Sequence, residues 1–332
     1  MFFASFVVKT VVSVDCPRMT RITVAVVALV TMTYAAIAQT RYPKNPLTLA
    51  THSSPGGGSD VFLREMAPFL SRILGVTIVV DNLQGGSGAR AMAMVSRARP
   101  DGGLLYATTP TFIYTSLLSR PTATYHDLEP LVNVFYDPEV LYTAADAKLR
   151  TLRDVIDAAR KGRGRWGAAN PASLERQTLE RLKQKAGVSA VVATFDGGGD
   201  MLINVLNHTL DMGIGELQEL RGQLDAGQLR VLAVVGDRRL PQLPDVPTVK
   251  EQGIDLAVRK FRGLAGPRGT PAAAITALEA AVPQMLSDAK YKQIYTSNGL
   301  QPGFIAHAAY VTFIADFGKQ TEAFLKETRV IK

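Results

Sequence analysis

The sequence predicts an α/β fold built on doubly wound, largely parallel sheets. Short apolar strands alternate with amphipathic helices from residue 47 to residue 235, and this alternation is typical of parallel sheets with helices on both faces. Three glycine-rich loops each follow an apolar strand and precede a helical pattern: Pro55-Gly56-Gly57-Gly58-Ser59-Asp60, Gly85-Gly86-Ser87-Gly88 and Gly197-Gly198-Gly199-Asp200. Because ligands of such sheets bind at the carboxyl ends of the strands, the loops indicate the expected binding edge.

In the first part of the chain, apolar residues at helical spacing predict a helix over residues 60–74, and Gly75 is expected to end it. A second helix is expected over 89–98. Short apolar runs predict the strands between them, at residues 47–50, 77–80 and 104–107. The turn Pro100-Asp101-Gly102 precedes the third strand.

The same alternation restarts in the second part. Apolar runs predict strands at residues 165–169, 191–195, 211–214 and 231–235. Helical spacing predicts helices over residues 152–160, 173–186, 200–206, 217–226, 271–286, 287–297 and 308–327. Extended stretches near 135–143 and 259–266 are expected to cross between two lobes, the first formed by 41–142 plus 264–332 and the second by 143–263.

The N-terminus has the pattern of an export signal. Arg21 supplies a positive charge, Thr23 to Thr33 is an apolar core, and Ala36-Ile37-Ala38 matches an A-x-A cleavage site. We expect residues 1–38 to be removed and the rest to reach the periplasm; a buried N-terminal helix or an anchor is the alternative. Met19 is an alternative start of translation. The single cysteine, Cys16, lies in this segment, so the mature chain is expected to lack disulfides.

Composition and motifs exclude several function classes. The formal net charge is +8, but the lysines and arginines are scattered without interleaved aromatics, so no nucleic-acid partner is expected. The glycine loops complete neither G-x-S-x-G nor a nucleotide-binding motif, and the 4 histidines show no paired metal-ligand spacing. We therefore expect no catalytic residue, no metal and no cofactor. Glycine loops at helix starts instead present backbone N–H groups, which suits an anion.

Several motifs together resemble one known family. The most specific is Leu243-Pro244-Asp245-Val246-Pro247-Thr248-Val249, within the stretch 239–253. The others are Pro55-Gly56-Gly57 with Asp60, Val80-Asp81-Asn82, Arg99-Pro100-Asp101-Gly102, and Gly263-Leu264 with Pro267-Arg268-Gly269-Thr270-Pro271. From about Tyr42 onward the chain resembles the extracytoplasmic substrate-binding proteins of tripartite tricarboxylate transporters, the Bug or TctC family.

The resemblance implies a type II-like, two-lobed periplasmic binding protein that closes by a hinge motion on a small carboxylate. It also implies delivery of that ligand to the inner-membrane permease subunits of a tripartite tricarboxylate transporter. We expect the protein to be monomeric. The ligand is expected to be a mono- or dicarboxylate or an amino acid. A sensing receptor without a cognate transporter and a carboxylate-ester hydrolase are the alternatives.

The second lobe departs from the family pattern. Ala168-Ala169-Asn170-Pro171-Ala172-Ser173 replaces the usual serine- and glycine-rich loop, Arg176 stands where a histidine is common, and Phe261 replaces a tryptophan. Arg176 either supplies a second anion contact or faces solvent. The expected ligand-binding residues are Pro55, Gly56, Gly57, Gly58, Ser59, Asp60, Gly85, Gly86, Ser87, Thr109, Asn170, Ser173, Gly197, Gly198, Asp200 and Glu216. Helix capping alone also accounts for Ser59, Asp60, Ser173 and Asp200.

Overall fold

The computed structural model describes Tyr42 and residues 46–332, so the predicted export signal lies outside the described residues. The strands form a six-stranded and a five-stranded sheet. The first sheet has the order β11-β4-β10-β3-β1-β2. Its strands are β1 (Leu47–Thr51), β2 (Ile78–Asn82), β3 (Leu104–Thr108), β4 (Leu128–Asp137), β10 (Lys260–Pro267) and β11 (Gln301–Ile305). We call this sheet and its helices, residues 46–137 and 260–332, the first lobe.

The second sheet has the order β7-β6-β8-β5-β9. Its strands are β5 (Glu139–Ala144), β6 (Gly164–Ala169), β7 (Ala190–Phe195), β8 (Met212–Glu216) and β9 (Leu229–Val234). We call this sheet and its helices, residues 139–259, the second lobe. The division at 142/143 and 263/264 remains a prediction; the strands change sheets at Pro138 and between Val234 and Lys260.

The predicted α/β class with two sheets is confirmed, but the sheets are mixed rather than mainly parallel. Parallel pairs join β1 to β2 and β3, and β6 to β7 and β8. Each sheet also contains an antiparallel strand that begins where the chain enters that lobe. In the first sheet, β10 pairs antiparallel with β3 and β4; in the second, β5 pairs antiparallel with β8 and β9. These strands start at the edge where the parallel strands end, so they must run in the opposite direction.

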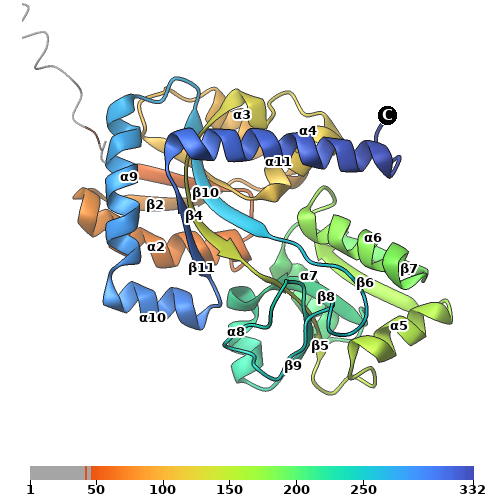
Figure 1. The fold of residues 1–332 in the computed structure, drawn as a ribbon. Helices are drawn as coiled ribbons and strands as arrows, with labels where there is room; N and C mark the ends of the chain where they lie inside the picture. Colours follow the sequence, from red (N-terminus) through yellow and green to blue (C-terminus); the bar gives the residue numbers. More distant parts are fainter. Residues whose placement is uncertain (1–41, 43–45) are drawn as a thin grey trace, which may run out of the picture. The chain divides into compact units, whose positions relative to one another are not determined.

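Helices cover both faces of each sheet (Figure 1). On the first sheet, α2 (Gly58–Leu74), α9 (Ala272–Leu286) and α10 (Ala289–Ser297) pack into one core. The other face carries α3 (Ala89–Ser96), α4 (Pro110–Ser119) and α11 (His307–Glu327). On the second sheet, α5 (Leu152–Arg160) and α6 (Leu174–Ala186) lie opposite α7 (Gly198–Leu206) and α8 (Leu217–Asp225). Short 3₁₀ turns, η1 (Gly86–Gly88) and η2 (Tyr125–Asp127), complete the first lobe.

Helix α2 illustrates how the sequence specifies these elements. Phe62, Leu63, Met66 and Leu70 recur at helical spacing and are buried against the sheet. Gly75 ends the helix in the left-handed conformation, with φ of 68°, and its N–H donates to the carbonyl of Ser71. The helix therefore begins in the first glycine loop and directs its N-terminus to the edge where β1 ends.

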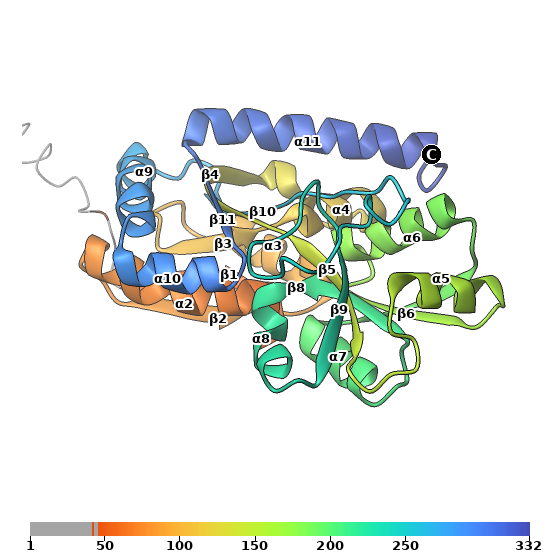
Figure 2. The same cartoon turned by 60° about the horizontal axis from the view of Figure 1, so that its bottom comes forward.

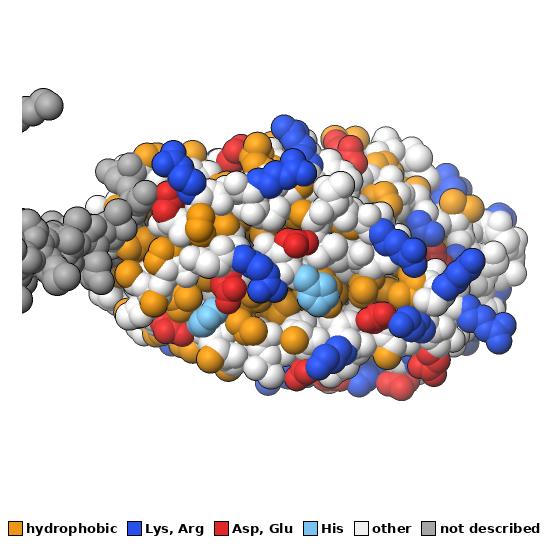
Figure 3. Space-filling model, turned by 90° about the horizontal axis from the view of Figure 1, so that it is seen from above, with side chains coloured by type: hydrophobic (Ala, Val, Ile, Leu, Met, Phe, Trp, Pro, Cys, Tyr) orange, Lys and Arg blue, Asp and Glu red, His pale blue; other side chains and the backbone are white. Residues whose placement is uncertain are grey.

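The last helix, α11, contacts both lobes. It packs along the first sheet, and its end lies beside α6 (Figure 2). There Leu325, which is fully buried, packs with Leu174 of α6. The Arg181 guanidinium of α6 lies 4.9 Å from the centre of the Phe324 ring. On the face that includes α11, charged side chains of both signs are scattered among apolar ones (Figure 3).

Among the helices of the described part of the chain, none is both long enough and apolar enough to cross a membrane.

Candidate functional site

The carboxyl ends of the strands of both lobes meet around one small cavity of about 20 Å³. Six of the predicted ligand-binding residues line it, three from each lobe: Gly58, Ser59, Thr109, Asn170, Gly198 and Glu216. Further lining residues, which the sequence analysis did not single out for the site, include His52, Thr111, Glu175, Glu219 and Lys260. A cavity of this size holds about one water-sized group, so the lobes are close together here.

The first glycine loop is held by its own hydrogen bonds. Asp60 accepts from the N–H of Gly56 at 2.9 Å, and its other oxygen accepts from Arg64 and Asn82, each at 2.9 Å. Burial would raise the pKa of Asp60, but these hydrogen bonds lower it below its ordinary value. Asp60 therefore fixes the loop and does not line the cavity, while Gly57 packs against Ser53 and Ser54.

Five further predicted residues are not part of the cavity wall. Pro55, Gly56, Gly85, Gly86 and Asp200 are exposed to solvent. Their role in ligand binding remains a prediction.

Three of the predicted residues instead lie where the lobes touch or where a helix starts. The hydroxyl of Ser87 accepts from the N–H of Ala172 at 3.3 Å, which joins the first lobe to the second. Gly197 lies so close to Ser54 of the first lobe that a Cβ on it would overlap the serine hydroxyl. Ser173 accepts from the N–H of Arg176 at 3.0 Å as the N-cap of α6.

Arg176 is paired within its own helix and with the neighbouring strand. Its guanidinium lies 2.7 Å from a carboxylate oxygen of Glu180, one turn along α6. A further nitrogen donates to the carbonyl of Val192 at 3.4 Å. Both of these contacts lie within the second lobe, and Arg176 is not among the residues that line the cavity.

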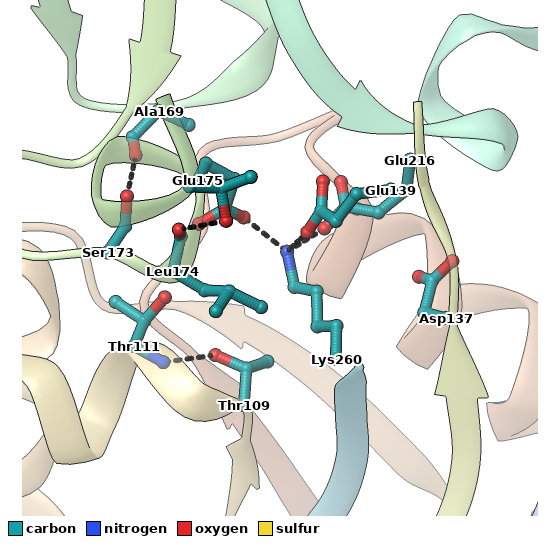
Figure 4. Close-up of polar contacts among 12 residues, drawn as sticks. Thr109, Thr111, Asp137, Glu139, Ala169, Ser173, Leu174, Glu175, Glu216 and Lys260 are labelled. Atoms are coloured by element: carbon teal, nitrogen blue, oxygen red, sulfur yellow. Dashed lines mark hydrogen bonds and ion pairs between the residues drawn. The ribbon is translucent and has the colours of Figure 1, made fainter. Parts of the chain in front are cut away.

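A buried cluster of charged residues lies beside the cavity, at the junction of the two sheets (Figure 4). Its centre is the ammonium of Lys260, the first residue of β10. It is paired with Glu175 and Glu216, and it lies 3.2 Å from an oxygen of Glu139. The lysine side chain is only 5% exposed, and the three carboxylates are as deeply buried.

Arg262 extends the cluster along the same face of β10. Its guanidinium lies 2.5 Å from Asp137 and 2.9 Å from Glu216, and it donates to the hydroxyl of Ser59 at 2.9 Å. The side chain of Arg262 is 1% exposed. Lys260 and Arg262 therefore pair with acids of the second lobe. Arg262 also contacts Asp137, at the end of β4, and Ser59 of the first glycine loop.

Glu219 occupies the position that the sequence analysis assigned to a ligand carboxylate. One of its oxygens accepts from the N–H of Gly58, at the start of α2, at 3.0 Å, and the other accepts from Glu216 N–H, at the start of α8, at 3.3 Å. A Cβ on Gly198, the first residue of α7, would lie 2.4 Å from the same carboxylate. Three helix N-termini thus converge on a carboxylate of this chain itself.

Burial and mutual repulsion shift the pKa values of the cluster. Burial raises the pKa of Glu139 to about 8 and that of Glu219 to about 8, with Glu175 adding to both shifts. Burial would also raise the pKa of Glu175, but Lys260 lowers it below its ordinary value. Burial would lower the pKa of Lys260, but Glu139 and Glu175 raise it. Lys260 and Glu175 are therefore both charged at neutral pH.

The carboxylate oxygens of Glu139, Glu175 and Glu216 lie within 4.8 Å of one another, a spacing that also suits a metal ion. Here the cation they share is the Lys260 ammonium. His52, on the cavity wall, forms a 2.8 Å hydrogen bond through Nδ1 with the hydroxyl of Tyr106, and burial lowers its pKa to about 4. His52 is therefore neutral and bound to a tyrosine.

The sequence contains a signal for the cluster that lies outside its motifs. Lys260 and Arg262 alternate with apolar residues in a short stretch otherwise typical of a buried strand, so they must share one face of it. Asp137 and Glu139 flank Pro138 between two apolar runs in the same way. Charged residues inside strands that are otherwise buried need partners of opposite charge. The spacing of these residues in the sequence does not predict which residues of the other lobe those partners are.

This is the two-lobed α/β fold of periplasmic binding proteins. Its defining features are two sheets, a chain that crosses between them more than once, and a cavity at the strand ends. Solved structures share this fold. R. palustris Rpa4515, determined with adipate, has a TM-score of 0.81 at 26% identity, over 86% of this chain and 98% of that one. MatC (Rpa3494) from Rhodopseudomonas palustris, with bound malate, has a TM-score of 0.77 at 22% identity, over 85% and 99% of the chains.

The family follows from the sequence comparison. The model for the tripartite tricarboxylate transporter family receptor, TctC, matches residues 62–330, so the chain belongs to the TctC family. BugT of Bordetella pertussis is 26% identical over 301 residues, 89% of this chain and 92% of BugT. The predicted resemblance is confirmed, and the family is one of periplasmic solute-binding proteins.

Proposed function

We propose that this protein captures a small organic carboxylate between its lobes in the periplasm and delivers it to the permease subunits of a tripartite tricarboxylate transporter. The observation that carries the proposal is the meeting of glycine-led helix starts from both lobes at one cavity. Family membership and the adipate in a relative of 26% identity support the chemical class of the ligand.

Export is part of the proposal. Cleavage after Ala38 removes the apolar segment and leaves Gln39 as the first residue. Mass spectrometry of the protein from the periplasm of an expressing bacterium gives its N-terminus. A mature chain beginning at Gln39 supports export, whereas an intact N-terminus from Met1 or Met19 in the cytoplasm contradicts it.

The binding function is tested with protein expressed as the full chain, purified, and freed of bound solutes by unfolding and refolding. We expect at least one acid from a panel of mono- and dicarboxylates and amino acids, adipate included, to raise the melting temperature in a concentration-dependent way. A ligand that binds only the folded state stabilises it by mass action. Failure of every acid, in a protein whose circular dichroism shows a native refolded state, contradicts the proposed function.

A further inference from the structure

Two adjoining cavities, of about 520 Å³ and about 230 Å³, lie beside the segments that cross between the lobes. Tyr136, Arg238, Arg259 and Gln301 line both of them. Tyr136 and Gln301 belong to the first lobe, and Arg238 and Arg259 belong to the second. We call the larger one the crossover cavity. It lies between the lobes, as the cleft cavity does, but no residue lines both.

The alternation of side chains separates the crossover cavity from the buried cluster. Asp137 and Lys260 direct their charges into the cluster. Successive side chains of extended chain point to opposite faces, so their neighbours Tyr136 and Arg259 lie on the other face. There the Arg259 guanidinium lies 3.5 Å from the centre of the Tyr136 ring. The crossover cavity is therefore a separate site on the opposite face of the same segments.

The wall of the crossover cavity is positively charged. The described residues that line it include Arg238, Arg239 and Arg259 and no carboxylate. Arg239 is the only one of the three that pairs with a carboxylate of the described residues, that of Glu251, at 3.0 Å. Arg238 and Arg259 are exposed, so an anion can reach them from solution. Two guanidinium groups thus line one cavity without a counter-charge.

The acids nearest to this wall already have partners. Asp237 lines the smaller cavity, and its carboxylate lies 2.6 Å from the ammonium of Lys250. Asp137 also lines the smaller cavity, and its carboxylate lies 2.5 Å from the guanidinium of Arg262. These carboxylates therefore do not supply the counter-charge that the crossover cavity lacks.

The stretch 239–253, which contains the most specific motif of the sequence, forms part of this wall. It contributes Arg239, Pro241 and Gln242 to the crossover cavity, and none of its residues lines the cleft cavity. The side-chain amide of Gln242 donates to the carbonyl of Thr296, in the first lobe, at 2.5 Å. The stretch therefore belongs to the crossover cavity and fixes its wall against the first lobe.

We propose that the crossover cavity binds a phosphate-type dianion, either inorganic phosphate or the phosphate group of a small ester, through Arg238 and Arg259. A guanidinium group presents its N–H donors in a planar fork that matches phosphate oxygens. Two unpaired cations match two negative charges, and a volume of about 520 Å³ is in the range of small-ligand sites. This site is additional to the cleft and does not rest on the proposed function.

Isothermal titration calorimetry tests the site with the purified protein at pH 7, in a phosphate-free buffer of low ionic strength. The probes are inorganic phosphate and glycerol 3-phosphate, and glycerol is the neutral counterpart of the ester. We expect at least one of the two anions to bind with a dissociation constant of about 1 mM or tighter, since it accepts two charge-assisted hydrogen bonds. Glycerol should not bind, and added sodium chloride should weaken the binding of the anion.

A pair of double variants tests the assignment to the two arginines. Replacing both Arg238 and Arg259 by Gln should weaken anion binding about tenfold or more. Replacing both Arg150 and Arg153 by Gln is the matched control. It removes the same two charges from exposed positions that do not line the cavity, and it should leave the affinity unchanged. Circular dichroism and the melting temperature verify that both variants fold.

Each outcome decides the proposal. Binding of phosphate alone, or of the ester alone, supports the site and identifies which source of the phosphate group it accepts. Equal weakening in the two double variants means that the anion responds only to net charge, and it overturns the site. Undiminished binding without Arg238 and Arg259 places the anion elsewhere, and no binding of either probe also overturns the inference. A protein that binds these anions but no organic acid loses only the proposed function.

Discussion

Lys260 shows how one residue joins the two lobes. It belongs to β10 of the first lobe, yet its ammonium lies among glutamates of the second lobe. Removing one partner from a buried ion cluster leaves charges without compensation, and that penalty exceeds the net contribution of the pair. The residue is therefore expected to matter more for stability than its single charge suggests.

We predict that Lys260→Met, which keeps much of the side-chain volume, destabilises the protein by about 3–5 kcal/mol. The physical reason is that Glu175 and Glu216 lose their shared counter-charge while staying buried. Urea denaturation at pH 7, followed by circular dichroism, gives the change in the free energy of unfolding.

Lys250→Met is the matched control. The Lys250 ammonium lies 2.6 Å from Asp237, but its side chain is 41% exposed and that of Asp237 is 82% exposed. Exposed pairs contribute about 1 kcal/mol or less. If the loss of Lys260 costs no more than the loss of Lys250, the buried cluster does not stabilise the contact between the lobes.

The sequence predicted the cavity residues that contribute backbone groups better than those that contribute side chains. The glycine loops were recognisable because a helix start after a strand places N–H groups at a known edge, and Gly58 and Gly198 do line the cavity. Glu175 and Glu219 lie within ordinary helical patterns, so nothing local distinguishes them from solvated acids. Only the tertiary packing of one lobe on the other reveals their burial.

At the scale of elements, periodicity predicted the helices that have a polar face and missed the one that lacks it. Helix α4, Pro110–Ser119, is buried over most of its length, so its residues show no alternation of apolar and polar faces. Thr109 as N-cap and Pro110 as the first helical residue were the available signals. Strand β11, Gln301–Ile305, was also not predicted. It contains proline and glycine, which are tolerated in an edge strand but weaken the sequence signal for a strand.

The start of α2 gives a prediction about how closely the lobes approach. A Cβ on Gly58 would lie 2.6 Å from Arg262 Nη2 and 2.6 Å from Glu216 Oε2. We therefore expect Gly58→Ala to displace the second lobe from the glycine loop and to weaken ligand binding by about tenfold or more. Calorimetry with an acid that raises the melting temperature of the unmodified protein measures the affinity.

A second glycine separates this effect from helix propensity. Gly222 lies inside α8, and a Cβ there would have no neighbour within 4 Å. Gly222→Ala should stabilise the protein by about 0.5–1 kcal/mol and leave ligand affinity unchanged. Equal ligand affinities in the two variants would show that Gly58 is not part of the cleft.

At the scale of the whole described chain, titratable groups form many of the contacts between the lobes. Glu139, Glu175, Glu216 and Glu219 come from the second lobe, whereas His52, Asp137, Lys260 and Arg262 come from the first. The large apolar cores lie within the lobes, and the contacts between the lobes include the apolar packing of Leu325 on Leu174 as well as polar contacts such as Gly58 to Glu219 at 3.0 Å. Because these groups gain or lose protons, the stability of the contact between the lobes depends on pH.

The sign follows from the shifted acids. Burial raises the pKa of Glu139 and of Glu219 from 4.5 to about 8, so the folded protein keeps protons that the unfolded chain has released. Each acid contributes stability that is fully present below pH 4.5 and is lost as the pH rises through about 8. His52, with its pKa lowered from 6.5 to about 4, acts in the opposite direction, chiefly below pH 6.5.

We predict that the free energy of unfolding falls between pH 6.5 and pH 8, by up to about 1.4 kcal/mol per pH unit for each acid. Urea denaturation across this range measures the slope. Glu219→Gln keeps the shape of the side chain but cannot ionise, so it should remove one acid's share of the slope. The exposed Glu251→Gln should keep the wild-type slope, since the pKa of Glu251 is lowered by its hydrogen bonds to Thr248 and Arg239 and it stays ionised throughout. A Glu219→Gln variant with the wild-type slope would mean that this acid is already charged in the folded protein, and the contact with Gly58 would then be a charged hydrogen bond.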